Sequence, residues 1–260
     1  MTKKFIFTDL DSTLIPPRKP IPDSAKKAIE LLLKNGHEVF ACTGRNYFAG
    51  EAVLDVAHTG GIYSVGGQIV IDGKTVKLSA FNEENIQTIK DIANKYDFCV
   101  SMVTENDVFV NGWAYENRRA EPYYEGHFFP LDQYDGSPCA KMNFHTLPEQ
   151  EEDLNKAIGE LEAHGFSHAF KSIKTSVEIT ANGISKGSAI RWLADNGYIS
   201  LQDTIGFGDS YNDLEMLKEC AYSIAIGSGD PYIFDFVDMV SDGILDDGFY
   251  NAFKKLGLID

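Results

Sequence analysis

The side chains that could do chemistry gather in four short runs, each at the end of an apolar stretch or at the start of a helical pattern. Carboxylates dominate these runs, and they act as nucleophiles, as general acids and bases, and as ligands of hard divalent cations. A lysine at a helix start also stands where backbone N–H groups favour an anion. The runs hold Asp9 and Asp11; Thr43, Gly44 and Arg45; Lys186; and Asp209, Asn212 and Asp213.

Taken one at a time, these residues have ordinary structural explanations. Asp9 could cap the end of a strand, and Asp209 and Asp213 could cap the start of a helix. Lys186 could be a solvated surface lysine. Taken together they are harder to explain, because clustered carboxylates are costly without a cation among them. The set therefore predicts a site for Mg²⁺, which binds oxygen ligands and keeps water and substrate phosphate as its others.

Alternating strand and helix patterns must position these runs. Phe5–Phe7 and Val39–Cys42 are apolar runs typical of a parallel sheet covered on both faces. Between them, Asp23 or Ser24 is expected to cap a helix. The same order returns at 185–226, which predicts an α/β fold with a doubly wound, Rossmann-like parallel sheet. Ligands bind outside the carboxyl ends of such strands, so the four runs are expected to meet there.

The middle of the sequence follows a different pattern. Asp72-Gly73-Lys74 lies between two strand-like runs and predicts a hairpin, after which helical and strand-like stretches alternate. This pattern predicts an α+β module inserted into the α/β core. We expect the insertion to span residues 80–184 and the core to consist of residues 1–79 and 185–260.

One strand-like run of the insertion has a clear alternation. It places Lys141, Asn143 and His145 on one face, with apolar residues on the other. The preferred interpretation is that this polar face is open to solvent. The alternative is that it lines the roof of a pocket and binds hydroxyl groups or a second anion.

The composition excludes some partners. The chain has 260 residues, with 23 Lys plus Arg against 39 Asp plus Glu, which gives a formal charge of −16. This charge repels nucleic acids and anionic membrane surfaces, so neither is expected as a partner. No stretch approaches the roughly 18 apolar residues of a membrane span. Four scattered cysteines indicate free thiols of a reducing compartment. We therefore expect a cytoplasmic protein, and the sequence predicts no oligomeric state.

Four motifs resemble the signature of the haloacid dehalogenase superfamily. They are Asp9-Leu10-Asp11-Ser12-Thr13, Thr43, Gly183-Ile184-Ser185-Lys186-Gly187, and Gly208-Asp209 followed by Asp213. The expected insertion resembles the type IIB cap of the Cof-type sugar-phosphate phosphatases. The sequence departs from the Cof-type pattern at Gly66-Gly67, where Asn-Gly is usual, and at Ile226-Gly227-Ser228-Gly229, where Met-Gly-Asn-Ala is frequent. Gly66 thereby lacks a polar side chain that could have faced the pocket.

The resemblance implies a two-step phosphoryl transfer. Asp9 is the implied nucleophile, which forms an aspartyl-phosphate, and Asp11 is the implied general acid and then base. The inserted module is expected to close over the site and to select the leaving group. The implied Mg²⁺ ligands are Asp9, the backbone carbonyl of Asp11, and Asp209, with Asp213 either a ligand or a holder of bound water. The implied phosphate-binding residues are Thr43, Gly44, Arg45 and Lys186. Asn212 is a further one unless it only caps a helix.

The sequence therefore predicts a Mg²⁺-dependent phosphatase for small phosphate monoesters, with sugar phosphates as the first expectation. Its partner is then a small phosphorylated metabolite. A phosphomutase or another phosphotransferase is the main alternative, because the first steps of the reaction are the same. A catalytically silent binding protein of the same fold is the alternative from a different class.

Overall fold

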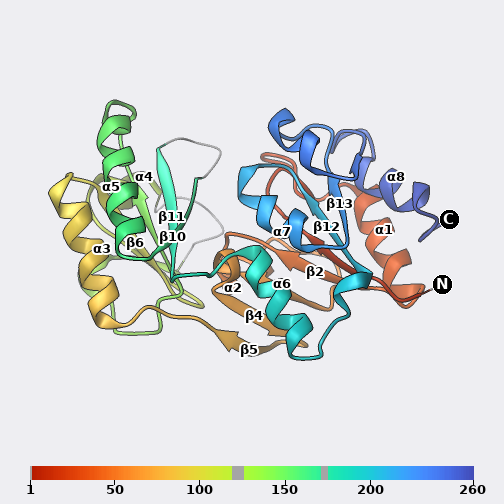
Figure 1. The fold of residues 1–260 in the computed structure, drawn as a ribbon, viewed down its shortest axis with the longest axis horizontal. Helices are drawn as coiled ribbons and strands as arrows, with labels where there is room; N and C mark the ends of the chain where they lie inside the picture. The colour runs from red at the N-terminus through yellow and green to blue at the C-terminus, as the bar shows by residue number, and fades with distance from the viewer. Residues whose placement is uncertain (1, 119–125, 171–174) are drawn as a thin grey trace.

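The computed structural model describes residues 2–118, 126–170 and 175–260. Within them the chain forms two β-sheets, a core sheet of eight strands and a cap sheet of six. The two sheets lie next to each other along the longest axis of the molecule, and both chain ends lie on the side of the core sheet (Figure 1).

The core sheet has the strand order β14-β13-β12-β1-β2-β3-β4-β5. The pairs from β14 to β3 are parallel, whereas β3-β4 and β4-β5 are antiparallel. Its strands are β1 (Phe5–Thr8), β2 (Glu38–Cys42), β3 (Gly60–Tyr63), β4 (Gln68–Ile71), β5 (Lys74–Leu78), β12 (Thr204–Gly208), β13 (Tyr222–Ala225) and β14 (Met239–Val240).

Helices cover both faces of the core sheet, because successive side chains of a buried strand point to opposite sides. In β1, Ile6 belongs to the apolar cluster that α1 and α8 cover, whereas Phe7 belongs to the one that α6 and α7 cover. The helices of this part of the chain are α1 (Asp23–Lys34), α2 (Tyr47–Glu51), α6 (Lys186–Asp195), α7 (Leu214–Glu219) and α8 (Gly248–Lys255).

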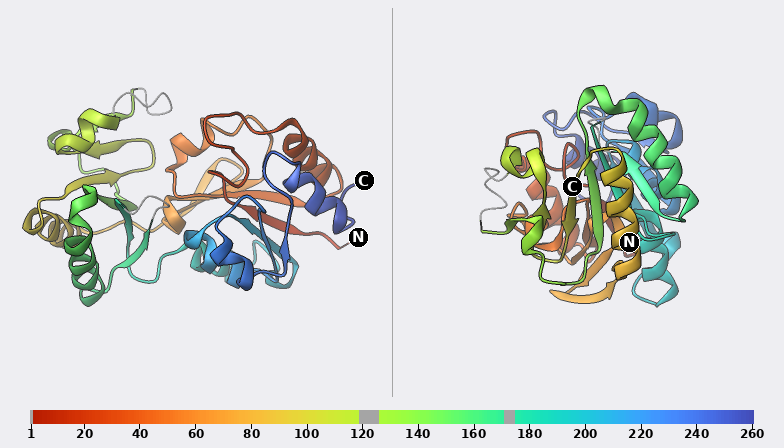
Figure 2. Two further views of the ribbon diagram at one scale, coloured as in Figure 1. Left: turned by 90° about the horizontal axis from the view of Figure 1, so that it is seen from above. Right: turned by 90° about the vertical axis from the view of Figure 1, so that its left-hand side faces the viewer.

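The cap sheet has the order β10-β11-β9-β6-β7-β8 and is antiparallel except for the pair β7-β8. Helices α3 and α5 pack on its outer face, away from the core, around Met142 and Phe144 (Figures 1 and 2). The elements are α3 (Glu83–Lys95), β6 (Cys99–Val103), β7 (Val108–Val110), α4 (Gly112–Arg118), β8 (Phe128–Pro130), β9 (Lys141–His145), α5 (Glu151–Ala163), β10 (Ser167–Phe170) and β11 (Ser176–Thr180).

The other face of the cap sheet is polar, yet it is buried. Lys141, Asn143 and His145 are 3%, 4% and 2% exposed, so the interpretation that this face is open to solvent is wrong. Its polar atoms instead bind one another. Asn143 Nδ2 donates to Ser101 Oγ at 2.6 Å, and His145 Nε2 lies 3.0 Å from the same oxygen.

The α/β fold class expected from the sequence is confirmed, and the hairpin at Asp72-Gly73 joins β4 to β5. The start of α1 differs from the expectation. Pro22 occupies the N-cap position, and no side chain caps this helix. Asp23 lies in the first turn instead, where its negative charge interacts favourably with the helix dipole.

We propose that residues 80–184 form a domain inserted into a core of residues 1–79 and 185–260. Strand membership supports this division, because β6 to β11 form the cap sheet and all other strands form the core sheet. No helix in the described ranges is long and apolar enough to cross a membrane. All four cysteines of the chain are free and buried.

Candidate active site

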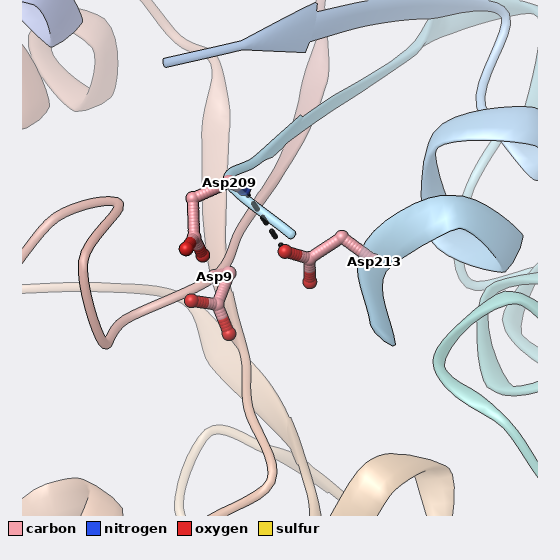
Figure 3. A group of neighbouring side chains, drawn as sticks. All are labelled: Asp9, Asp209 and Asp213. Carbon is pink, nitrogen blue, oxygen red and sulfur yellow. Dashed lines mark hydrogen bonds between the residues drawn. The ribbon is translucent and has the colours of Figure 1, made fainter. Parts of the chain in front are cut away.

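Neighbouring strands of the core sheet bring two of the predicted carboxylates together. β1 and β12 pair in parallel, with Thr8 opposite Phe207, so the residues that follow them leave the sheet at the same edge. The backbone N–H of Asp9 continues this ladder and donates to Phe207 O at 2.9 Å. Asp9 and Asp209 therefore face one another at the carboxyl ends of the strands (Figure 3).

A third carboxylate completes the group. One oxygen from each of Asp9, Asp209 and Asp213 lies within 4.8 Å of the others (Figure 3). Asp213 is held by the backbone, because its Oδ2 accepts hydrogen bonds from the N–H groups of Asp209 at 3.0 Å and Ser210 at 3.2 Å. Thr13 holds Asp209 by donating from Oγ1 to Oδ1 at 3.0 Å.

Lys186 supplies the positive charge inside this group. It is the first residue of α6, which Ser185 caps by accepting a hydrogen bond from the N–H of Ser188. Its Nζ donates to Asp9 Oδ1 at 2.6 Å and to Asp213 Oδ1 at 2.7 Å, and the side chain has no exposed surface. The ammonium therefore bridges two of the three carboxylates.

The electrostatics of the group show an excess of negative charge. Burial raises the pKa of Asp9 well above its ordinary value, although Lys186 opposes the shift, and Asp213 and Asp209 raise it further. Burial and the charge of Asp213 raise the pKa of Asp209 to about 7. Burial alone would lower the pKa of Lys186, but Asp213 and Asp9 outweigh it and hold the pKa above its ordinary value. One ammonium does not balance three carboxylates, so a further cation is favoured here.

The donor set fits a hard divalent ion. Asp9, Asp209 and Asp213 offer carboxylate oxygens, which are the ligands that Mg²⁺ prefers. Mg²⁺ is commonly bound by one or two carboxylates while it keeps water and phosphate oxygens as its other ligands. The third carboxylate is then available to hold bound water or the lysine.

The end of β2 forms a loop beside the carboxylates. The Thr43 N–H donates to Ile62 O at 2.8 Å, and Thr43 Oγ1 accepts a hydrogen bond from the Arg45 N–H at 3.1 Å. Arg45 extends its guanidinium to Asp11, with Nε 2.8 Å from Oδ2 and Nη2 2.7 Å from Oδ1. The Asp11 side chain is 55% exposed. The structure therefore pairs Asp11 with Arg45.

The remaining predicted residue, Asn212, lies in the turn before α7. Its Oδ1 accepts a hydrogen bond from Ser210 Oγ at 2.6 Å, which is a contact within the turn itself. Thr13, for which the sequence alone indicates no role, is fully buried against Asp209. Only its place at the end of the motif Asp9-Leu10-Asp11-Ser12-Thr13 could have pointed to it.

A strained turn connects the β2 loop to Lys186. Ser64, Val65 and Gly66 have positive φ values of 52°, 57° and 98°. The N–H groups of Ser64 and Val65 bind the carbonyls of Arg45 and Thr43 at 2.7 and 3.1 Å. A Cβ atom on Gly66 would lie 2.1 Å from Ser185 O. Gly66 is therefore not a vacant place in a pocket wall; a side chain there would collide with the backbone that starts α6.

Known proteins resemble this chain over most of its length. The family model described as haloacid dehalogenase-like hydrolase matches residues 6–253. The 5-amino-6-(5-phospho-D-ribitylamino)uracil phosphatase YcsE of Bacillus subtilis is 24% identical over 254 residues, covering 96% of this chain and 94% of its own.

Two solved structures have the same fold. BT1666 from Bacteroides thetaiotaomicron, a phosphatase of the haloalkanoate (HAD) superfamily, superposes with a TM-score of 0.85 at 23% identity, covering 99% of this chain and 96% of its own. The HAD subclass IIB sugar phosphatase BT4131 superposes with a TM-score of 0.82 at 21% identity, covering 99% of this chain and 100% of its own.

Proposed function

The chain belongs to the haloacid dehalogenase-like hydrolase family and is a phosphatase, and from this premise we propose that it hydrolyses small phosphate monoesters with Mg²⁺ through an aspartyl-phosphate on Asp9. One observation carries the proposal: the buried Asp9 carboxylate lies beside Lys186, Asp209 and Asp213 at the carboxyl ends of β1 and β12. These contacts support the proposal, because the proposed nucleophile lies beside an ammonium and beside carboxylates that could bind a metal ion.

The first step is an attack by Asp9 on phosphorus. Its carboxylate oxygen forms a bond to phosphorus while the ester P–O bond breaks, and Asp11 gives a proton to the leaving oxygen. Lys186 neutralises charge on Asp9 and on the transferring group, while Thr43 and the Gly44 N–H bind phosphoryl oxygens. Asp9, Asp209 and the Asp11 carbonyl would hold Mg²⁺, with Asp213 either a further ligand or the holder of its bound water, and the ion would supply the positive charge that lets two anions approach.

The second step releases phosphate. Asp11 takes a proton from water, the water oxygen bonds to phosphorus, and the acyl-phosphate bond breaks to regenerate the Asp9 carboxylate. Both oxygens of Asp11 accept hydrogen bonds from Arg45. The guanidinium beside both oxygens favours the ionised form of Asp11. We therefore propose that substrate draws Arg45 toward the phosphate and so releases Asp11 for acid–base work.

A polyhydroxylated phosphate monoester is the proposed class of substrate. The similar protein BT4131 is a sugar phosphatase, and YcsE acts on a phosphorylated ribityl compound. Both substrates carry hydroxyl groups beside the phosphate. We place the enzyme in the cytoplasm, which the four free, buried thiols support.

Phosphate release from a panel of phosphate monoesters tests the proposal, with Mg²⁺ and with EDTA. We expect Mg²⁺-dependent release by the wild type and a loss of at least about 10³-fold in Asp9→Asn, because the nucleophile is removed. Asp72→Asn is the matched control, because Asp72 is exposed in the β4-β5 turn and asparagine also tolerates its positive φ of 48°. Transfer to an added alcohol instead of water would identify a phosphotransferase, and no phosphate chemistry in a folded wild type would contradict the proposal.

A further inference from the structure

A charged pair of the cap sheet contacts the β2 loop of the core, residues 43–45, which we propose to bind phosphate. Lys141 Nζ lies 2.5 Å from Glu178 Oε1, and both side chains are almost fully buried, at 4% and 2% exposure. The same Nζ donates to the backbone carbonyl of Gly44 at 2.5 Å. Lys141 is in β9 and Glu178 in β11, whereas Gly44 follows β2. One ammonium thus joins the two sheets.

This contact fixes the orientation of one peptide group. The Gly44 carbonyl points to Lys141, and the N–H of the same peptide, which belongs to Arg45, points to Thr43 Oγ1 at 3.1 Å. Because Thr43 Oγ1 accepts that hydrogen bond, its own proton remains to be donated elsewhere. The cap lysine therefore sets the loop so that the Thr43 hydroxyl serves as a donor, which is the role that a phosphoryl oxygen requires.

Glu178 holds the lysine and also packs against the loop. A Cβ atom on Gly44 would lie 2.8 Å from Glu178 Oε1. The carboxylate therefore occupies the space that a side chain at position 44 would need. Lys141 cannot be replaced by a cation from solvent while the sheets are docked, because the pair is almost completely buried.

We propose that Lys141 and Glu178 are positioning residues: the pair completes the phosphate-binding loop when the cap sheet docks on the core. The Gly44–Arg45 peptide loses its cap-side partner when the sheets part, so the loop binds phosphate tightly only in the docked state. This inference rests on the proposed phosphatase function, since it takes Thr43 and Gly44 to bind the phosphoryl group.

The double variant Lys141→Met/Glu178→Gln tests the proposal beside the single variant Lys141→Met. The single variant is expected to melt at a lower temperature, because Glu178 loses the ammonium beside it. The double variant removes both charges and is expected to recover much of that stability. Neither restores a donor to the Gly44 carbonyl. The readouts are thermal unfolding, calorimetric binding of orthovanadate with Mg²⁺ present, and kcat and KM for an aryl phosphate.

We expect the double variant to bind orthovanadate about tenfold or more weakly than the wild type and to lose at least tenfold in kcat/KM. Ser101→Ala is the matched control, because it removes a buried polar group from the same face of the cap sheet without touching Gly44. It should keep both quantities within about twofold.

Two outcomes would overturn the inference and can be told apart. A double variant that recovers stability, affinity and turnover together would show that the pair only stabilises the cap. A folded wild type that neither binds orthovanadate nor releases phosphate would remove the proposed function and this inference with it.

Discussion

Among single residues, Lys186 sets the charge balance of the site, because its ammonium is buried between Asp9 and Asp213. We predict that Lys186→Met lowers the stability of the metal-free protein by about 3–5 kcal/mol, since it leaves buried carboxylates uncompensated. Added Mg²⁺ should raise the melting temperature of the variant more than that of the wild type, because the ion then supplies the missing charge. Differential scanning calorimetry in EDTA and in Mg²⁺ measures both effects.

Lys254→Met provides the comparison for that experiment, since Lys254 is exposed on α8. Its stability should change by no more than about 0.5 kcal/mol. An equal response of both variants to Mg²⁺ would contradict the assigned role of Lys186.

The sequence predicts some residues of the site better than others. Asp9, Asp209 and Lys186 could be placed because they follow apolar strands or start a helix, and strand ends of a parallel sheet meet at one edge. The pairing of Arg45 with Asp11 could not be predicted. It depends on a long, flexible side chain and on a turn in which Ser12 has a φ of 68°.

At the scale of elements, the turn Ser64–Gly66 joins the β2 loop to the start of α6. We predict that Gly66→Ala destabilises the protein by about 3 kcal/mol or more, because the new Cβ would meet Ser185 O at 2.1 Å and the φ of 98° disfavours a side chain. It should also lower kcat, since Lys186 follows directly. Chemical denaturation and steady-state kinetics test this.

Gly73→Ala separates the collision from the backbone strain. Gly73 has a φ of 70° but no atom within 4 Å of its Cβ position. This variant should lose only about 1–2 kcal/mol and keep its kcat. Equal losses in the two variants would mean that the contact with Ser185 has no special effect.

A second element-scale feature links α2 to β3. Glu51 Oε1 accepts a hydrogen bond from the Tyr63 hydroxyl at 2.5 Å and lies 3.0 Å from His58 Nε2. The hydrogen bond to Glu51 raises the pKa of His58 above 6.5, and the one to His58 lowers the pKa of Glu51 below 4.5. The charged pair therefore stabilises the fold fully only between about pH 4.5 and 6.5.

We predict that His58→Gln costs about 0.5–1 kcal/mol at pH 5.5, because both side chains are partly exposed. As the pH rises through the folded pKa of His58 this contribution is lost, so the cost should nearly vanish at pH 9. Thermal melts at the two values measure it. A cost that is the same at both would show that the ion pair is not its source.

Elements were predicted where local signals sufficed. The β4-β5 hairpin follows from Asp72-Gly73, because the chemistry of a tight turn is local. The short strand β8 was not predicted, because three residues ending in Pro130 carry no alternation. The burial of Asn143 could not be predicted either, since it depends on how the cap sheet faces the rest of the molecule.

At the scale of the whole molecule, the charge of −16 opposes the approach of a phosphate dianion. We predict that raising NaCl from about 10 to about 100 mM lowers KM a few-fold and leaves kcat unchanged, because the Debye length falls from about 30 to about 10 Å. Initial rates at saturating Mg²⁺ test this. The KM of a phosphate monoester that also carries an ammonium group should change less with salt. A KM that rises with salt would mean that cationic side chains near the site, and not the net charge, control the attraction of the substrate.

The two sheets are joined at more than one place. Besides the Lys141 contact, the turn between β6 and β7 docks on the core: Asn46 Nδ2 donates to Thr104 O at 3.2 Å, and Gln68 Nε2 donates to Glu105 Oε1 at 2.7 Å. These contacts hold the cap sheet over the carboxyl ends of the core strands, where the candidate site lies.

The central place of β1 has a consequence for the order of events during synthesis. β1 pairs on one side with β2, which leaves the ribosome soon after it, and on the other with β12, which begins only at Thr204. Residues 80–184 therefore emerge complete while β1, the strand that leads into Asp9, still has an unpaired edge. Such edges are prone to pair with other chains. The nascent protein thus has its greatest need of chaperone protection in the interval before β12, which begins at Thr204, is made.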